Sequence, residues 1–309
     1  MSLPEFYHEG DLIAVLTTQP LGRTLDYKAP EGGCHLGAFL EVPLGPRKVL
    51  GVVWGPGQGD YDRAKIRPAI RVLDAAPMRA EMRTFLQRAA DYTLTPLPSM
   101  LRLATRAPGL GDPPSMQKVY RYGTGAADRV TPARRKVLDT LEEFGDLSFT
   151  LKELAELAGV SISGVKGLVA QGAVLEENTP RDLPCPRLDP DLPGKVLTTE
   201  QEAAAEYLAD AVTSQKYGTT LLRGVTGSGK TEVYLEAVAA ALKQGRQALV
   251  LLPEIALTAE FITRVEERFG RRPAEWHSGA TMTERRRIWR MVGLGEVQLV
   301  VGARSALFL

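Results

Sequence analysis

The sequence predicts an α/β protein of several domains, because three parts of the chain carry three different hydrophobic patterns. Short β-forming runs separated by Gly and Pro occupy residues 1 to about 76, which indicates a small β-rich module. Helical spacing interrupted by tight turns follows in residues 131–176. From residue 198 onward, apolar strand-like runs alternate with helical segments, a pattern typical of a parallel sheet covered on both faces.

The composition is that of an ordinary globular protein. The chain has 309 residues, of which 44% are hydrophobic and 24% are charged, a balance that suggests two or three domains. The sequence contains no run of 18 apolar residues and no signal segment, so we expect no membrane partner and a cytoplasmic location. Cys34 and Cys185 have no second thiol or histidine at metal-binding spacing, which predicts free thiols and no zinc ligands in this chain.

The net charge of +1 argues against a uniformly basic nucleic-acid-binding protein. Local clustering must carry any such function. Residues 61–106 hold nine Arg or Lys residues against four acidic ones. A phosphate track and a solvated face explain such a cluster equally well.

The N-terminal module is predicted from five strand-like runs and one helix. The runs are residues 12–17, 24–29, 38–44, 48–54 and 66–73, and the helix covers residues 78–92. Residues 105–128 have the Pro-rich and Gly-rich composition of a linker. We therefore expect the first domain to span residues 1–105.

The second domain, residues 106–190 with its linker, is predicted to be a winged helix. Thr131 caps a helix over residues 131–144, the capping box from Thr150 to Glu153 begins a second helix, and a third covers residues 162–171 before a short strand. This third helix carries Lys166 as its only cation. We therefore favour a structural or protein-docking role for it over DNA recognition.

The third domain, residues 191–309, is predicted to be a P-loop domain with a parallel sheet. Its strands are expected at residues 219–225, 247–252, 274–277 and 297–302, with helices beginning at residues 230, 256 and 282. A capping box formed by Thr198 and Gln201 begins the preceding helix.

The segment Gly224-Val-Thr-Gly-Ser-Gly229-Lys230-Thr231 matches the phosphate-binding P-loop at every fixed position. In this motif glycines let backbone amides approach the phosphates, the lysine places a cation on the β and γ oxygens, and the threonine hydroxyl binds Mg²⁺. The predicted nucleotide site is Gly224, Val225, Thr226, Gly227, Ser228, Gly229, Lys230 and Thr231. Lys230 and Thr231 are the catalytic candidates, and Thr231 is the predicted magnesium ligand.

Further blocks make the chain closely resemble the PriA family, the superfamily 2 helicases of bacterial replication restart. In the C-terminal part they are residues 224–235, 253–258, 277–279 and 302–308, and in the N-terminal part residues 23–27, 42–45, 51–53 and 89–92. The resemblance implies a DNA-binding N-terminal module, a winged helix and an incomplete first RecA-like lobe. It also implies ATP and Mg²⁺ as cofactors, 3′-to-5′ unwinding driven by ATP hydrolysis, and loading of the replicative helicase.

The resemblance assigns DNA-contacting residues by position. Leu25, Asp26, Gly45 and Arg67 fall where the family holds the nascent 3′ end, and Asp26 is expected to accept a hydrogen bond from the 3′-hydroxyl. Leu25 stands where an aromatic residue is common, and Arg67 where lysine is common. Arg304 and Ser305 match a block that lines the DNA track.

Several of these residues have plainer interpretations. Gln201 falls where related helicases read the adenine edge, but a capping role is equally good, and on sequence alone Asp26 reads as a turn or sheet-edge carboxylate. Arg285 to Arg287 with Arg290 could contact phosphate, but we favour a solvated helix face. His277 is expected to be structural or close to DNA.

Family membership further implies partners. They are forked DNA with single-stranded regions and a free 3′ end, other primosome proteins, the single-stranded DNA-binding protein and the replicative helicase loader, in the bacterial cytoplasm near the nucleoid. Zinc is expected only in the C-terminal part of the full-length family.

The sequence ends at Leu309 before the family's acidic magnesium motif and second lobe. We therefore expect an N-terminal fragment or a truncated form of a replication restart helicase. The alternative is a non-catalytic adaptor that binds fork DNA. A small-molecule P-loop kinase fits the P-loop alone.

Overall fold

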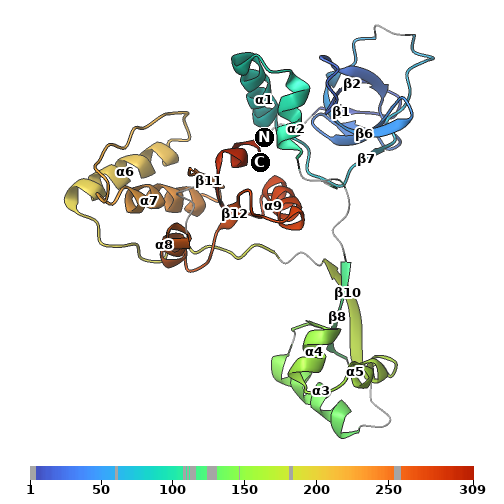
Figure 1. Ribbon diagram of the computed structural model, residues 1–309, viewed down its shortest axis with the longest axis vertical. Coiled ribbons are helices and arrows are strands. Elements are labelled where there is room, and N and C mark those ends of the chain that lie inside the picture. Colours follow the sequence, from blue (N-terminus) through green and yellow to red (C-terminus); the bar gives the residue numbers. More distant parts are fainter. Residues whose placement is uncertain are drawn as a thin grey trace. The chain divides into compact units, whose positions relative to one another are not determined.

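The computed structural model describes residues 5–59, 62–106, 109, 111, 116–123, 131–145, 147–180, 184–253 and 259–309. The chain divides into two compact units (Figure 1). The first combines Met1–Asp112 with Pro184–Leu309, and the second is Pro113–Leu183. Within the first unit we call residues 5–106 the N-terminal module and residues 184–309 the C-terminal lobe. The predicted three-domain boundaries remain a prediction.

The N-terminal module is built on a five-stranded antiparallel sheet with the order β3-β2-β6-β5-β7. Its strands are β2 (Leu12–Thr17), β3 (Leu25–Lys28), β5 (Phe39–Leu44), β6 (Arg47–Pro56) and β7 (Arg71–Val72), and the separate β1 (Phe6–Tyr7) pairs with β4 (Cys34–His35). The first four predicted strands are confirmed. The fifth was predicted too long, because Pro68 has no N–H to donate to a ladder and only a single bridge joins it to Lys28.

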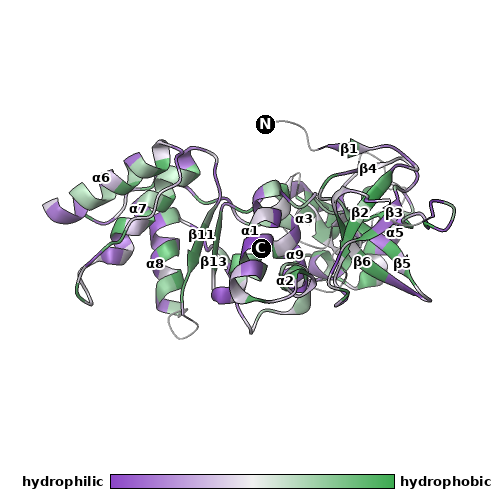
Figure 2. Cartoon of the chain, turned by 90° about the horizontal axis from the view of Figure 1, so that it is seen from above, coloured by the Kyte–Doolittle hydropathy of each residue, from purple (hydrophilic) through white to green (hydrophobic). Residues whose placement is uncertain are grey.

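Both faces of this sheet are buried, which explains the nearly continuous apolar sequence of β2 and β6 (Figure 2). Ile13 and Val15 lie in one core cluster, whereas Leu16 belongs to a second cluster on the helical side. The second cluster is closed by α1 (Ala80–Thr93) and α2 (Leu97–Ala104). The sequence predicted α1 but not α2, whose second residue is Pro98.

The second unit packs three helices against a three-stranded antiparallel sheet with the order β10-β8-β9. Its elements are β8 (Met116–Tyr122), α3 (Pro132–Phe144), β9 (Phe149–Thr150), α4 (Leu151–Leu157), α5 (Ile162–Val169) and β10 (Val174–Pro180). The Thr131 cap and the Thr150 to Glu153 capping box are confirmed. The prediction of a linker throughout residues 105–128 was wrong, because β8 lies inside it and pairs along its full length with β10.

The C-terminal lobe contains a parallel sheet with the order β11-β13-β12, from β11 (Ala248–Leu251), β12 (Ala274–Trp276) and β13 (Leu299–Gly302). Leu299 and Val301 pack with α7 (Lys230–Lys243) and α8 (Ala259–Phe269), whereas Val300 packs with α9 (Met282–Leu294). This alternation along β13 places helices on both faces. The remaining elements are α6 (Thr199–Thr213) and the 3₁₀ turn η2 (Arg304–Phe308).

The predicted buried strand at residues 219–225 was wrong. These residues form no strand, and Leu221 and Val225 are 81% and 77% exposed. A strand is stable only beside a hydrogen-bonding neighbour, and within the described ranges none pairs with this segment. The helix start predicted at residue 256 falls among residues 254–258, which lie outside the described ones.

Candidate DNA-end and nucleotide sites

The four residues predicted to hold a DNA 3′ end line one hollow of about 280 Å³ on the N-terminal module. They are Leu25 and Asp26 of β3, Gly45 in the turn between β5 and β6, and Arg67. The other lining residues are Tyr27, Pro43, Lys65 and Ile66. The structure therefore brings together side chains from three separate stretches of sequence.

This hollow lies where the sheet closes on itself. In the sheet order β3 and β5 are separated by two strands, yet the hydroxyl of Tyr27 donates to the carbonyl oxygen of Pro43 at 2.9 Å. The amide of Lys28 also donates to the carbonyl of Arg67 at 3.1 Å, and that of Ala69 donates to the carbonyl of Lys28 at 2.9 Å. The segment before β7 thus runs beside β3 and brings Arg67 into the hollow that Asp26 also lines.

Asp26 holds a neighbouring loop in this structure. Its Oδ1 accepts the amide of Gln58 at 3.1 Å, and its Oδ2 accepts the amide of Gly59 at 2.7 Å. The plainer interpretation, a sheet-edge carboxylate, is therefore confirmed. A carboxylate oxygen accepts more than one hydrogen bond, so these contacts fix the orientation of Asp26 and leave it capacity to accept a hydroxyl.

Two cations accompany the carboxylate in the hollow, Lys65 and Arg67. Burial raises the pKa of the Tyr27 phenol, and the nearby Arg67 guanidinium opposes that rise. Lys65 and Tyr27 were not singled out from the sequence. Lys65 could have been found as a member of the basic cluster in residues 61–106, and Tyr27 as the residue that directly follows Asp26. The hollow combines an acceptor for a hydroxyl with donors for phosphate oxygens.

The P-loop has the backbone geometry that its glycines predict. Gly227 and Gly229 have φ values of +81° and +75°, a region that side chains disfavour. A Cβ added to Gly224 would lie 2.5 Å from the Ser228 hydroxyl. The ammonium of Lys230 donates to the loop's own carbonyls, those of Gly224 at 2.8 Å and Val225 at 2.7 Å. The loop thus folds tightly around the ammonium group of Lys230. The positive charge of this group and the start of a helix suit the binding of an anion such as phosphate.

Gln201 connects the start of α6 to this loop. It completes the predicted capping box with Thr198, which is confirmed. Its Nε2 also donates to the carbonyl of Ser228 at 2.9 Å, and a Cβ on Gly229 would meet that nitrogen at 2.3 Å. Adenine recognition by Gln201 stays a prediction.

Thr231 is half-buried in the first turn of α7. Burial raises the pKa of the Tyr234 phenol, and a hydrogen bond with the Thr231 side chain opposes that rise. The next residue, Glu232, lies 3.7 Å from both Lys195 and Arg264. Thr231 thus lies beside a charged network that joins the preceding linker to α7 and α8.

Arg304 and Ser305 are exposed at the start of η2, directly after the carboxyl end of β13. His277 follows the parallel β12, and its Nδ1 accepts the amide of Gly279 at 3.1 Å. Carboxyl ends of parallel strands share one edge of a sheet. This edge therefore presents Arg304 and His277, while residues 254–258, which follow β11 closely, lie outside the described residues.

The interpretation of the α9 arginines as a solvated face was wrong for two of them. Arg285 donates to the carbonyls of His277 at 2.8 Å and Ser278 at 2.9 Å. Arg290 forms an ion pair with Asp74 of the N-terminal module. Charge runs on a helix do not reveal such carbonyl and carboxylate partners, because those partners lie elsewhere in the sequence.

Among the residues that the structure describes, no three His, Cys, Asp or Glu side chains gather as they would to bind a metal ion. None of the helices in the described ranges is long and apolar enough to cross a membrane.

Comparisons with known proteins match both ends of the chain. Residues 14–106 match the family model of the PriA 3′ DNA-binding domain, and residues 198–309 match that of the DEAD/DEAH box helicase. The Replication restart protein PriA of Bacillus subtilis is 27% identical over 96% of this chain and 47% of its own length, and that of Haemophilus influenzae is 29% identical over 96% and 42%. The Replication restart protein PriA of Rickettsia felis is 43% identical over 37% of this chain and 17% of its own length.

The chain thus spans less than half the length of these curated relatives. The first family model covers the hollow, and the second covers the P-loop, Gln201 and η2.

Proposed function

We propose that the chain acts as a PriA-like replication restart protein, that its N-terminal module binds the exposed 3′ end of a DNA strand and that its P-loop binds ATP with Mg²⁺; the two family matches and the similarity to the Bacillus subtilis relative support this. In this proposal the chain recognises stalled fork DNA as the N-terminal part of a 3′-to-5′ helicase. The name of these relatives, Replication restart protein PriA, supports replication restart as the process.

The observation that best supports this proposal is that the four predicted DNA-end residues lie together in the hollow. Leu25, Asp26, Gly45 and Arg67 line one cavity. A terminal 3′-hydroxyl donates to the Asp26 carboxylate, whereas the phosphate of an uninterrupted strand is repelled by it. Arg67 and Lys65 neutralise the phosphate that precedes the terminal nucleotide.

Binding of nucleotide phosphates falls to this chain's own P-loop groups. Lys230 exchanges the carbonyls of Gly224 and Val225 for the β and γ oxygens, and Thr231 holds Mg²⁺, which neutralises phosphate charge when bound. Gln201 orients the loop through the Ser228 carbonyl. Arg304 and Ser305 contact the DNA track in the same proposal.

The finer assignments belong to the same proposal. The second unit is a winged helix, the C-terminal lobe is a RecA-like domain, and the location is the bacterial cytoplasm near the nucleoid. Its partners beyond DNA are primosome proteins, the single-stranded DNA-binding protein and the helicase loader.

The test compares fluorescent oligonucleotides that end in a 3′-hydroxyl or a 3′-phosphate. We expect the unmodified chain to prefer the hydroxyl end. Asp26→Asn removes the charged acceptor and should weaken hydroxyl-end binding roughly tenfold to a hundredfold, while narrowing the gap between the two ends. Arg67→Ala should weaken both ends and reduce the salt dependence by about one phosphate contact.

The matched control is Asp11→Asn. Asp11 also accepts a backbone amide, that of His8 at 2.7 Å, and does not line the hollow. Fluorescence anisotropy should show parental binding for this variant. An unchanged hydroxyl preference in Asp26→Asn would refute the assignment.

A second candidate function is a non-catalytic adaptor that binds fork DNA. The observation that favours it is the unpaired segment before the P-loop, where Leu221 and Val225 are exposed. Titration of the purified chain with a fluorescent ATP analogue and Mg²⁺ separates the two candidates. Binding that Lys230→Ala abolishes supports the P-loop proposal, whereas no binding supports the adaptor.

A further inference from the structure

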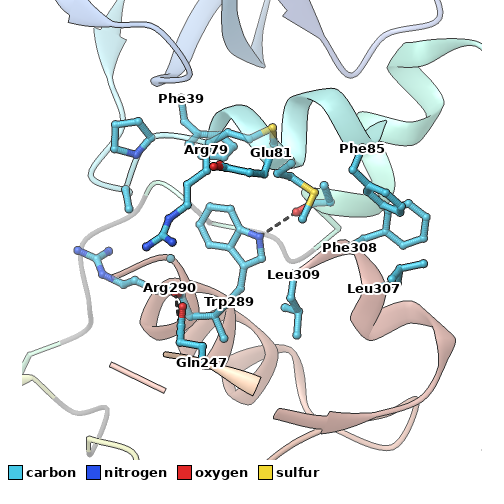
Figure 3. A pocket seen from close by; sticks show the side chains of 17 residues that line it. Phe39, Arg79, Glu81, Phe85, Gln247, Trp289, Arg290, Leu307, Phe308 and Leu309 are labelled. Atoms are coloured by element: carbon cyan, nitrogen blue, oxygen red, sulfur yellow. Dashed lines mark hydrogen bonds between the residues drawn. The ribbon is translucent and has the colours of Figure 1, made fainter. Parts of the chain in front are cut away.

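Two elements of the C-terminal lobe contact the N-terminal module at a joint formed by Asp74, Phe85, Ala104, Trp289, Arg290 and Phe308. Figure 3 labels four of these residues, Phe85, Trp289, Arg290 and Phe308. The elements are α9, which supplies Trp289 and Arg290, and η2, which supplies Phe308. The joint therefore connects the part of the chain that holds the hollow with the part that holds the P-loop.

Trp289 is the central anchor of the joint. Its indole N–H donates to the carbonyl oxygen of Ala104, the last residue of α2, at 2.8 Å. Its ring meets the Phe39 ring edge-on, with centroids 5.2 Å apart. Figure 3 shows this indole reaching from α9 to the module. Such aromatic pairs and an N–H bond combine apolar contact with a fixed direction.

Two further contacts flank Trp289. Arg290 pairs with Asp74, which follows β7 closely. Phe308 packs against Phe85 of α1, with ring centroids 5.7 Å apart. Both Trp289 and Phe308 pack against the core cluster that closes the helical side of the sheet.

The same two elements carry candidate DNA-contacting groups at their other ends. At the start of α9, Arg285 holds the carbonyls of residues 277 and 278 at the carboxyl edge of the parallel sheet. At the start of η2, Arg304 and Ser305 are exposed at that edge. Trp289 lies about one helical turn after Arg285, and Phe308 lies three positions after Ser305. Movement at the joint therefore displaces the edge.

The joint is incompletely packed. A cavity of about 400 Å³ lies beside it, lined mainly by apolar side chains that include Met78, Met82 and Trp289. Because this cavity is partly open to solvent, the side chains that line it do not pack fully across the joint. The few contacts named above therefore hold the joint together, so that single substitutions should loosen it without unfolding either part.

We propose that Trp289, supported by Arg290 and Phe308, is a positioning residue that fixes the distance between the DNA-end hollow and the DNA-contacting edge of the C-terminal lobe. This inference rests on the proposed function. A strand bound at both places gains affinity because the second contact is intramolecular. A rigid joint fixes the distance between the two contact sites, and so determines how long a DNA strand must be to gain affinity from both.

The experiment uses the full chain and two probes with a 3′-hydroxyl. The short probe fills only the hollow, and the long probe extends past it to reach the edge of the lobe. We expect Trp289→Ala and Arg290→Ala to bind the short probe as the parent does and the long probe roughly tenfold or more weakly, because effective concentration is lost. Trp289→Phe keeps a ring but loses the N–H, so its affinity for the long probe should lie between those of the parent and Trp289→Ala.

A double-mutant cycle makes the test specific to coupling. Arg304→Ala should weaken long-probe binding in the parent but add little in the Trp289→Ala background, because the edge already contributes less there. The matched control is Arg272→Ala, which breaks the 3.0 Å ion pair with Glu275 inside the lobe. It should leave both probes unaffected.

The outcomes separate the two proposals. Parental long-probe affinity in Trp289→Ala and Arg290→Ala, or equal loss of both probes in every joint variant, overturns the positioning role. A parent chain that binds neither probe instead overturns the proposed DNA-end function.

Discussion

The DNA-end hollow and the P-loop differ in how sequence relates to structure. The P-loop residues are contiguous, and eight consecutive residues are enough to predict their chemistry. The segment that leads into the loop, residues 219–225, is nevertheless largely exposed and forms no strand. The hollow residues are scattered from Leu25 to Arg67, and the sheet brings them together. Their module has a buried core on both faces of the sheet.

This difference shows that the local geometry of a motif and the packing of the structure around it are separate properties. The P-loop glycines set the loop's backbone locally, through the φ values of Gly227 and Gly229. The hollow depends on strand pairing and on the bridge between Lys28 and Pro68. A local motif therefore survives where its flanking strand is unsupported, whereas the hollow exists only if the module folds.

The largest expected effect tests this contrast with one chemical change in both regions. Leu40→Ala removes a fully buried side chain of the module and should lower the free energy of unfolding by about 3 to 5 kcal/mol. Leu221→Ala, before the P-loop, alters a side chain that is 81% exposed and should change it by less than about 0.5 kcal/mol. Urea unfolding measures both. A loss above about 2 kcal/mol for Leu221→Ala would show that this segment is packed.

Local signals were sufficient for much of the fold. The caps at Thr131, Thr150 and Thr198 marked helix starts because a side chain and an amide three residues later form the whole signal. Alternating or continuous apolar runs located β2, β5, β6 and the three strands of the lobe.

Features that depend on distant partners were not predicted. β8 was taken for linker because its partner, β10, comes more than fifty residues later, and residues 219–225 were taken for a strand although no described strand pairs with them. In the sites, the contact of Gln201 with Ser228 and that of Trp289 with Ala104 join residues 27 and 185 positions apart. The hollow was located only through family resemblance.

The second contrast uses a glycine from each site. Gly229 and Gly45 both have positive φ, +75° and +58°. A Cβ on Gly45 meets nothing within 4 Å, whereas one on Gly229 lies 2.3 Å from Gln201 Nε2. Gly45→Ala should therefore cost about 1 kcal/mol of backbone strain, and Gly229→Ala about 2 to 3 kcal/mol, because the bond to Ser228 is also disturbed.

Chemical denaturation of the two variants, with nucleotide affinity measured by titration, checks this contrast. Gly229→Ala should also weaken nucleotide binding, and Gly45→Ala should not. Equal stability losses in the two variants would contradict the contact that the structure shows between Gly229 and Gln201.

The smallest effect contrasts the two thiols by their pH dependence. Cys34 lies in the module core, and burial raises its pKa to about 11. The unfolded thiol ionises near pH 8.5. Below that pH both states are protonated and the stabilisation is fully present. As the pH rises to about 10, the unfolded chain loses its proton first, so the free energy of unfolding falls by roughly 1 to 2 kcal/mol.

Cys185, half-buried in the lobe, provides the matched comparison. Burial raises its pKa as well, but the nearby Arg287 guanidinium opposes the rise. The unfolding free energies of Cys34→Ala and Cys185→Ala, measured from pH 8 to 11, should therefore differ in slope. Loss of Cys34 should flatten the alkaline decline more than loss of Cys185 does, whereas Tyr27, whose pKa is also raised by burial, contributes equally to both variants. Identical slopes would mean that the core around Cys34 admits water, and the contrast between a closed module and a less supported P-loop would lose its basis.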